Sequence, residues 1–186
     1  SDQATGVIEN IHERHNYIVR KSVNLSKQTH IIASNVDQVL LIVTINNPVT
    51  MTSLIDRFLV TAEAYHIKAV LLFNKIDTYD DTARETATLL QACYSKIGYT
   101  CLEISAQNQI NTESVKALMK GKVNMISGHS GVGKSTLVNA LDPDLNLRTA
   151  SISDQHQQGQ HTTTFAEMFD LEFDAQIIDT PGIRGF

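Results

Sequence analysis

Short apolar runs alternate with segments of helical periodicity along most of this 186-residue chain. The apolar runs have the length of β-strands, and the segments between them repeat apolar positions every three or four residues. This alternation is typical of an α/β fold, in which a parallel sheet carries helices on both faces. Strands are predicted over residues 38–45, 68–73, 99–104 and 122–127, and near 164–171 and 173–179.

The segments between the strands are predicted to form amphipathic helices that pack on the sheet. One apolar helix face consists of Leu54, Ile55, Phe58, Leu59 and Ala62, and a second consists of Leu89, Leu90, Cys93 and Ile97. Gly98 is the expected carboxyl cap of the second helix, and Asn111 is the expected amino cap of a helix over 112–120. A further helix is predicted over 134–141, and the polar segment 142–163 is predicted to be a long loop.

Residues 5–34 do not follow this alternation. They contain short β segments, GVIENI, YIVRK and HIIAS, separated by polar breaks. Residues 1–30 also carry four basic side chains against three acidic ones, whereas the whole chain has 15 Lys and Arg against 20 Asp and Glu. We therefore expect the amino-terminal segment to be separate from the βα alternation, which begins at Val36.

Composition limits the class of protein. The chain is 42% apolar, enough for the core of one domain of ordinary size, and its formal net charge of −5 provides no global positive field for nucleic acid. The apolar run 39–45 is too short to span a bilayer, and the start SDQATG lacks the features of a signal peptide. Cys93 and Cys101 are interpreted as reduced core thiols without a metal. We expect a soluble cytoplasmic protein with only local RNA contacts.

The segment GHSGVGKS, residues 128–135, lies between a predicted strand and a predicted helix. It matches the phosphate-binding pattern G-x-x-x-x-G-K-[ST], in which backbone N–H groups and a helix amino terminus face the phosphates. Lys134 is expected to reach the β and γ phosphates, and the Ser135 hydroxyl is expected to bind Mg²⁺. The expected nucleotide-binding residues are Gly128, His129, Ser130, Gly131, Val132, Gly133, Lys134, Ser135 and Thr136.

The quartet NKID, residues 74–77, ends a predicted strand at the edge of the sheet where ligands of open α/β folds bind. The Asp77 carboxylate can accept two hydrogen bonds from the N1–H and 2-amino groups of guanine, which adenine lacks. Asn74 and Lys75 are expected to brace this loop. A backbone N–H of Ser105, Ala106 or Gln107, after the next strand, is expected to bind the guanine carbonyl. Taken without these surroundings, Asp77 is an ordinary turn residue.

Two segments after the phosphate loop contain the remaining residues expected to contact Mg²⁺ and the γ phosphate. IIDTPG, residues 177–182, ends a predicted strand, and we expect Asp179 to hold Mg²⁺ through water and the Gly182 amide to meet the γ phosphate. In GQHTTT, residues 159–164, one threonine is expected to complete the metal shell, Thr163 first and Thr162 second. The predicted Mg²⁺ ligands are therefore Ser135, Thr163 and Asp179.

The base motif precedes the phosphate loop, which is a permuted order of the GTPase elements. The chain contains the segments ENIHERHNYIVR, ASNVDQVLLIV, GHSGVGKST, GQHTTT and DTPGIRGF. In these segments it resembles the circularly permuted GTPases of the RsgA (YjeQ) family, and the resemblance covers nearly its whole length. The resemblance implies a bacterial enzyme that hydrolyses GTP to GDP with Mg²⁺ during late maturation of the small ribosomal subunit. It implies contact with that subunit and its rRNA, stimulation of hydrolysis by the subunit, and a monomer. Permutation is tolerated because domain termini lie at the surface.

The resemblance also divides the chain. Residues 1–33 are similar to the last strands of the family's amino-terminal OB-fold domain, and residues 34–186 are similar to its permuted GTPase domain. The family's carboxyl-terminal zinc domain is expected beyond Phe186, and zinc is expected only there.

Catalysis is the least defined part of the sequence. Ile183 stands where other GTPases position water with a glutamine, and its side chain forms no hydrogen bonds. The resemblance implies His161 as the residue that orients the attacking water, with Lys134 and Thr163 as the other catalytic residues. Two alternatives stay open: a GTP-dependent RNA-binding or ribosome-binding switch with little hydrolysis of its own, and a permuted GTPase of large-subunit assembly.

Overall fold

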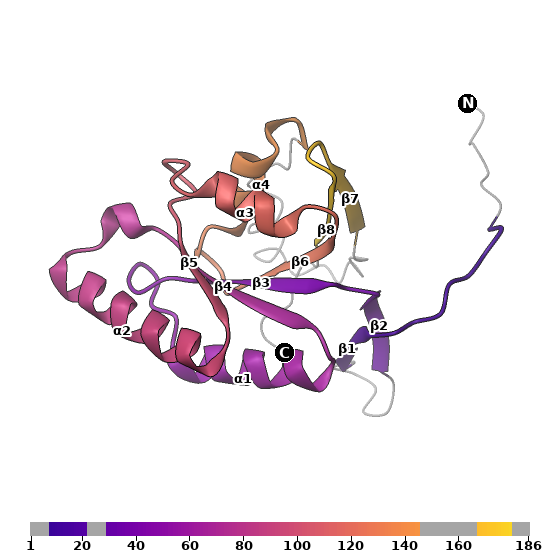
Figure 1. Cartoon of the computed structure of the whole chain (residues 1–186), viewed down its shortest axis with the longest axis horizontal. Coiled ribbons are helices and arrows are strands. Elements are labelled where there is room, and N and C mark those ends of the chain that lie inside the picture. Colours follow the sequence, from indigo (N-terminus) through magenta and orange to yellow (C-terminus); the bar gives the residue numbers. More distant parts are fainter. Residues whose placement is uncertain (1–7, 22–28, 146–166, 180–186) are drawn as a thin grey trace, which may run out of the picture.

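The computed structural model describes residues 8–21, 29–145 and 167–179. Within these ranges the main sheet has six strands (Figure 1). Their spatial order is β5 (Thr100–Glu103), β4 (Lys68–Phe73), β3 (Gln38–Val43), β6 (Val123–Ser127), β8 (Ala175–Asp179) and β7 (Glu167–Leu171). All neighbouring strands are parallel except β7, which runs antiparallel to β8. The mostly parallel sheet confirms the predicted fold class.

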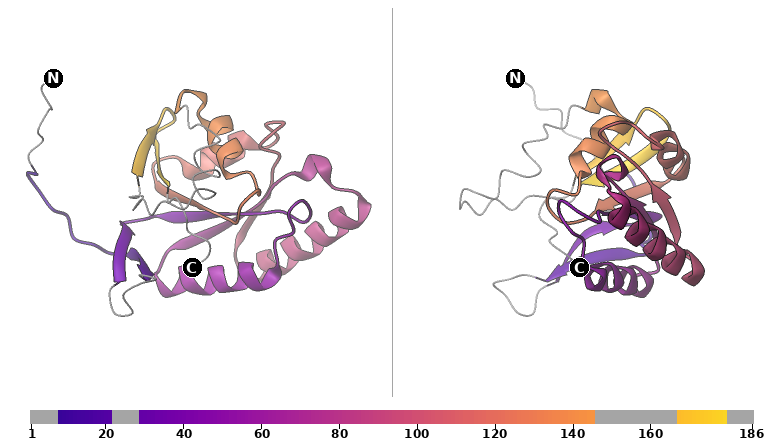
Figure 2. Two further views of the ribbon diagram at one scale, coloured as in Figure 1. Left: turned by 180° about the vertical axis from the view of Figure 1, so that it is seen from behind. Right: turned by 90° about the vertical axis from the view of Figure 1, so that its left-hand side faces the viewer.

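Helices cover both faces of this sheet, as predicted. Figure 1 shows helices below the sheet and above it, and Figure 2 shows them from two further sides. The lower pair is α1 (Thr52–Ala64) and α2 (Asp81–Ile97), and the upper pair is α3 (Thr112–Met119) and α4 (Lys134–Leu141). Two short 3₁₀ turns, η1 (Ile76–Thr78) and η2 (Pro143–Leu145), lie in the connections.

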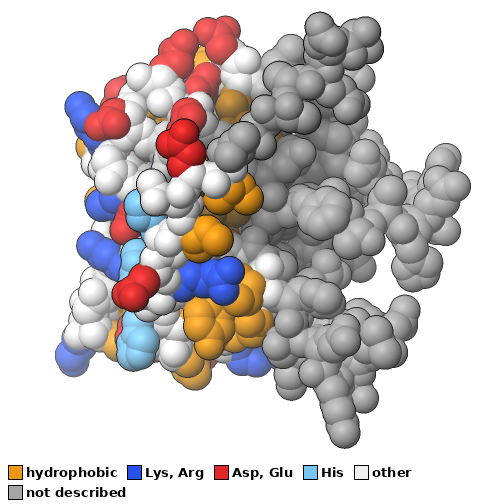
Figure 3. All heavy atoms as spheres, turned by 90° about the vertical axis from the view of Figure 1, so that its right-hand side faces the viewer, with side chains coloured by type: hydrophobic (Ala, Val, Ile, Leu, Met, Phe, Trp, Pro, Cys, Tyr) orange, Lys and Arg blue, Asp and Glu red, His pale blue; other side chains and the backbone are white. Residues whose placement is uncertain are grey.

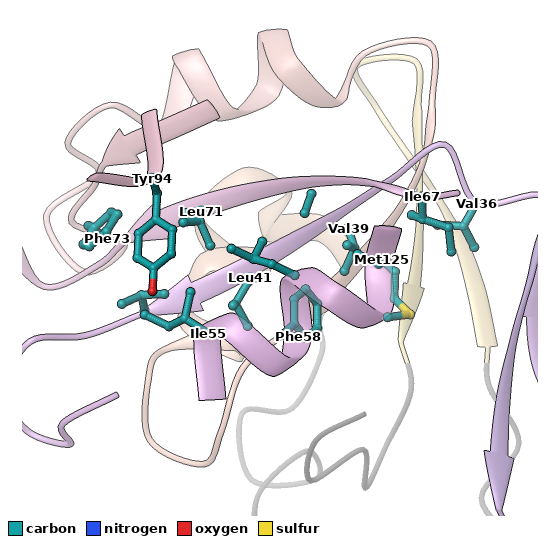
Figure 4. Close-up of a cluster of buried hydrophobic side chains, with 14 of the residues drawn as sticks. Val36, Val39, Leu41, Ile55, Phe58, Ile67, Leu71, Phe73, Tyr94 and Met125 are labelled. Atoms are coloured by element: carbon teal, nitrogen blue, oxygen red, sulfur yellow. The ribbon is translucent and has the colours of Figure 1, made fainter. Parts of the chain in front are cut away.

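The core has two layers because successive strand residues point to opposite faces. Leu41 of β3 packs in the cluster that includes Phe58 of α1, whereas the preceding Leu40 packs in the cluster with Leu137 of α4. Figure 4 shows the lower cluster, in which Leu41, Leu71 and Phe58 lie together. Every residue of β3 is buried, as expected for a central strand of a parallel sheet.

The amino-terminal segment forms a hairpin of β1 (Tyr17–Lys21) and β2 (Thr29–Ser34), which pair antiparallel. Residues 8–11, part of a predicted β segment, form no strand. The hairpin is fixed to the α/β core: Ile18 belongs to the lower cluster, and the Asn16 side chain binds both Val36 N and Val36 O at 2.8 Å. Figure 3, on the side where β1 and β2 lie, shows exposed apolar, basic and histidine side chains. The β1–β2 hairpin therefore packs directly against the lower core.

The predicted buried face of α2 is wrong except at Leu90, which is half-buried against the lower cluster. Leu89 is 72% exposed and Ile97 is 64% exposed. Cys93 is exposed too, so it is not a core thiol, while Cys101 is half-buried in β5. The helix instead buries Ala83, Ala87 and Tyr94. Small alanines allow α2 to approach the sheet closely, and the Tyr94 hydroxyl donates to the Asp56 carboxylate of α1 at 2.8 Å. Burial and this carboxylate raise the pKa of Tyr94.

Smaller differences concern the ends of elements. Gly98, at a φ of 117°, is the predicted carboxyl cap of α2. Asn111 precedes α3 as predicted, but its side chain donates to the Glu103 carbonyl at 2.8 Å and does not cap the helix. Asp174 lies in the β7–β8 turn, so β8 begins at Ala175 and not at residue 173 as predicted. In the part of the chain that the structure describes, no helix has the length and apolarity needed to cross a membrane.

Candidate nucleotide site

The predicted motifs meet at one edge of the sheet because parallel strands end on the same side. Asn74 follows β4, Ser105 follows β5, and Gly128 follows β6. Asp179 is the last residue of β8, the parallel neighbour of β6. Segments that are far apart in the sequence thus form one candidate site.

The phosphate loop requires glycine at two positions. Gly128 has a φ of 142°, and a Cβ atom built on it would lie 2.8 Å from the Ile42 carbonyl oxygen. Gly133 has a φ of 101°, and its Cβ would collide with the side-chain amide of Asn74. Both conformations are rare for residues with a side chain. The loop is therefore held against β3 on one side and against the NKID loop on the other.

Asn74 joins three segments through its side chain. It is 2% exposed. Its amide nitrogen donates to the Val132 carbonyl at 2.8 Å, and its amide oxygen accepts from the Ala106 N–H at 3.0 Å. The phosphate loop, the NKID loop and the Ser105–Gln107 loop are consequently fixed relative to one another without a ligand.

Lys75 and Tyr79 fix the NKID loop from its other side. The Lys75 ammonium donates to the Gly131 carbonyl at 2.7 Å and to the Asn47 carbonyl at 2.6 Å. The Tyr79 hydroxyl donates to the Asn74 carbonyl at 2.7 Å and accepts from the Ile45 N–H at 3.2 Å. Burial raises the pKa of Tyr79, which keeps the hydroxyl protonated as a donor. Asp77 follows on η1 with an exposed side chain, open to a base.

The Ser105–Gln107 loop is tightly structured. Ser105 is fully buried, and its hydroxyl accepts from the Asn108 N–H at 3.1 Å. The Ala106 N–H is engaged by Asn74, while Gln107 is exposed. Of the three residues predicted to supply an N–H to a guanine carbonyl, Gln107 is therefore the one whose position suits that task.

Lys134 lies across the phosphate loop. Its ammonium donates to the Gly128 carbonyl at 2.6 Å and to the His129 carbonyl at 2.9 Å. The ammonium therefore lies over the concave side of the loop, within reach of an anion placed there. Ser135 and Thr136 follow in the first turn of α4, where helix N–H groups favour negative charge.

The residues predicted to hold Mg²⁺ are only partly described. The register between β6 and β8 pairs Met125 with Ile178, so Asp179 ends β8 close to the start of the phosphate loop. Ser135 is the second residue of α4, which begins directly after Gly133 of that loop. Hydroxyl and carboxylate oxygens are ligands that Mg²⁺ prefers, so a serine and an aspartate on elements that meet at this edge fit this ion. His161, Thr162, Thr163 and Gly182 lie outside the described residues.

The sequence analysis missed the segment that flanks the phosphate loop. Residues 44–50, between β3 and α1, contribute the Asn47 carbonyl to Lys75 and the Thr50 hydroxyl to His129, at 2.9 Å from its Nε2. Thr44 and Ile45 were predicted as the end of a strand. The chain instead leaves β3 after Val43 and turns back, with the Thr44 N–H donating to the Thr50 hydroxyl at 3.0 Å. An Asn-Asn-Pro turn after a buried strand was the available signal.

Comparison with known proteins agrees with this geometry. The model of a family described as RsgA GTPase matches residues 11–186. A protein of Flavobacterium johnsoniae named small ribosomal subunit biogenesis GTPase RsgA is 66% identical over 186 residues. Its counterpart in Christiangramia forsetii is 64% identical over 185 residues. Both alignments cover 100% of this chain but only 57% and 59% of the relatives, so the chain spans less than two thirds of their length.

Solved structures show the same fold. The crystal structure of YjeQ from Thermotoga maritima superposes with a TM-score of 0.75 at 38% identity, covering 96% of this chain and 55% of that protein. YloQ, described as a circularly permuted GTPase, superposes with a TM-score of 0.69 at 28% identity, covering 95% of this chain and 51% of that protein. The permuted order of motifs is thus shared with proteins of known structure.

Proposed function

This chain belongs to the RsgA GTPase family, and from that premise we propose that it binds GTP and GDP with Mg²⁺ and hydrolyses GTP to GDP and phosphate. The observation that carries the proposal is the Asn74 side chain, which ties the phosphate loop to both base-binding loops. This arrangement fixes the distance between the two ends of a nucleotide before it binds, which lowers the entropic cost of binding.

Base selection is assigned to Asp77, with Gln107 supplying an N–H to the guanine carbonyl. A carboxylate that accepts two hydrogen bonds from guanine would face only acceptors or carbon-bound hydrogen on adenine. Asn74 and Lys75 hold the backbone that presents Asp77, through the contacts of Asn74 with Val132 and of Lys75 with Gly131.

Phosphate binding is assigned to the Gly128–Thr136 segment. The Lys134 ammonium would exchange its two carbonyl partners for β and γ phosphate oxygens. Ser135, Thr163 and Asp179 would hold Mg²⁺, which neutralises charge that develops on the transferred phosphoryl group. The Gly182 N–H would meet the γ phosphate.

Water positioning is assigned to His161. We predict that His161→Ala lowers GTP turnover about 100-fold or more, because a positioned general base contributes at least that much, and leaves GDP affinity within twofold of the wild type. Single-turnover phosphate release and nucleotide titration measure the two effects. His156→Ala, on the same polar segment, is the matched control. Unchanged turnover of His161→Ala in the presence of the activating partner would exclude the role.

The biological setting follows from the names of the relatives, which are small ribosomal subunit biogenesis GTPases. We propose that the protein to which this chain belongs acts on the small subunit and its rRNA in the cytoplasm. The test is phosphate release from GTP and ATP by the chain and by a form of the relatives' full length, each with purified small or large subunits. Stimulation of GTP hydrolysis by the small subunit supports the proposal. Stimulation by the large subunit favours large-subunit assembly, and binding without stimulated turnover favours a switch.

The amino-terminal hairpin is proposed as part of the family's OB-fold domain. The antiparallel pairing of β1 and β2 is compatible with this assignment. We propose the domain boundary between residues 33 and 34. Ile18 and Ala33 pack into the lower core, so the hairpin contacts the proposed GTPase domain.

A further inference from the structure

Residues 44–50 form a closed loop beside the phosphate loop. Thr44 N donates to the Thr50 hydroxyl at 3.0 Å, and Thr50 N donates to the Thr44 carbonyl at 2.8 Å. Thr44 is fully buried and Thr50 is 5% exposed. The Thr44 hydroxyl donates to the Pro48 carbonyl, which completes the closure. Because these hydrogen bonds fix the shape of the loop, the residues that pack on it are held in position as well.

This loop contacts both parts of the nucleotide site. Its Asn47 carbonyl accepts from the Lys75 ammonium at 2.6 Å. The Pro48 ring lies 3.5 Å from the point where a Cβ of Gly131 would be, so it packs directly on the phosphate loop. The Thr50 hydroxyl lies 2.9 Å from His129 Nε2. The base loop and the phosphate loop therefore share one support.

The hydrogen bond between Thr50 and His129 joins the 44–50 loop to the phosphate loop. Burial lowers the pKa of His129, and Lys134 and Lys75 lower it further, while a hydrogen bond with the Ser130 backbone opposes the shift. The lowered pKa favours the neutral ring. A neutral ring has one N–H and one acceptor nitrogen, so the His129 tautomer decides whether Nε2 or the Thr50 hydroxyl donates. Either tautomer keeps the two atoms 2.9 Å apart.

His129 connects this contact to the cationic side chain of the site. Its carbonyl accepts from the Lys134 ammonium at 2.9 Å, and the neighbouring Gly128 carbonyl accepts from the same group at 2.6 Å. The Thr50 contact holds the His129 side chain, and the two carbonyls belong to His129 and to the residue before it. A hydroxyl on the 44–50 loop can therefore influence where the phosphate-binding ammonium lies.

We propose that Thr50 is a positioning residue for nucleotide binding, which aligns residues 128–131 of the phosphate loop through its hydrogen bond to His129. Neither residue has to touch the nucleotide for this role. The inference rests on the proposed guanine-nucleotide binding and adds a residue outside the recognised motifs to it.

The test is a double-mutant cycle on nucleotide affinity in this chain, read with a fluorescent GDP analogue and Mg²⁺. Thr50→Val removes the hydroxyl at nearly constant volume, and with it the hydrogen bonds to His129 and from Thr44 N. Loss of the His129 bond is expected to weaken GDP binding about five- to tenfold, the value of one buried hydrogen bond. Loss of the Thr44 bond is expected to lower stability. Thr50→Ser keeps the hydroxyl and is expected to restore affinity to within twofold. Thr52→Val, at the exposed start of α1, is the matched control.

The His129→Ala variant tests whether Thr50 acts through His129. If Thr50 acts through His129, adding Thr50→Val to His129→Ala costs little further affinity, so the two effects are not additive. A purely structural role for Thr50 lowers the unfolding midpoint in urea but leaves the GDP affinity of the folded protein unchanged. Additive losses, or a Thr50→Val protein with wild-type affinity, overturn the inference alone. A wild-type chain that binds no guanine nucleotide overturns the proposed function as well.

Discussion

Gly133→Ala is expected to abolish nucleotide binding, with GDP affinity reduced at least 100-fold, and to lower the free energy of unfolding by about 3 kcal/mol. The added Cβ would collide with the side-chain amide of Asn74, at a φ of 101° that already disfavours alanine. Relief of the collision requires Asn74 to move, which breaks its bond to Val132 and separates the phosphate loop from the base loop. Urea denaturation and titration with a fluorescent GDP analogue measure the two effects.

Gly98→Ala is the control variant that introduces backbone strain without a steric collision. Gly98 has a φ of 117°, but a Cβ there would meet nothing within 4 Å. This variant is expected to cost about 1 kcal/mol of stability, the penalty of a left-handed conformation, and to bind GDP like the wild type. A Gly133→Ala protein that binds GDP within twofold of the wild type would contradict the account of the Asn74 bridge.

Asp77→Asn is expected to reverse the preference for the base. An asparagine can accept from guanine N1–H, but its amide N–H₂ then faces the guanine 2-amino group, donor against donor. GDP affinity is expected to fall about 100- to 1,000-fold, because one charged hydrogen bond is lost and one donor is left unpaired. Xanthosine diphosphate carries a carbonyl at that position and can accept the new donor, so its affinity is expected to rise.

Competition between GDP and xanthosine diphosphate for the fluorescent analogue measures this reversal. Asp81→Asn, at the first turn of α2, makes the same change of charge close to the site and is expected to leave both affinities unchanged. If Asp77→Asn retained the wild-type preference for GDP, Asp77 would not read the base.

The meeting of the motifs at one edge of the sheet could be predicted from the sequence, because it depends only on how the strands are arranged in the sheet. The runs before NKID and GHSGVGKS are strands whose parallel direction brings Asn74 and Gly128 to the same edge. Glycine at 128 and 133 is expected for close backbone approach, but its partners, Ile42 of β3 and the Asn74 side chain after β4, are remote in the sequence. Local pattern therefore predicts that these motifs meet at one edge but not which contacts fix them.

The 44–50 loop and the buried face of α2 could not be predicted for two different reasons. The loop acts through contacts between residues 28 to 79 positions apart, such as Asn47 with Lys75 and Thr50 with His129, which no local pattern encodes. In α2, large apolar residues suggested a core face that includes Leu89, yet close packing selected Ala83 and Ala87. Periodicity identified the helix, and packing volume decided its orientation.

We expect a guanine nucleotide to bind between the NKID loop and the phosphate loop. Calorimetric titration of the chain with GDP and with ADP, both with Mg²⁺, measures this. One GDP site per chain is expected, with an ADP affinity at least 100-fold weaker, since adenine leaves the hydrogen-bonding groups of Asp77 and Gln107 unmatched. Equal affinities for the two nucleotides, or no binding of GDP, would contradict it.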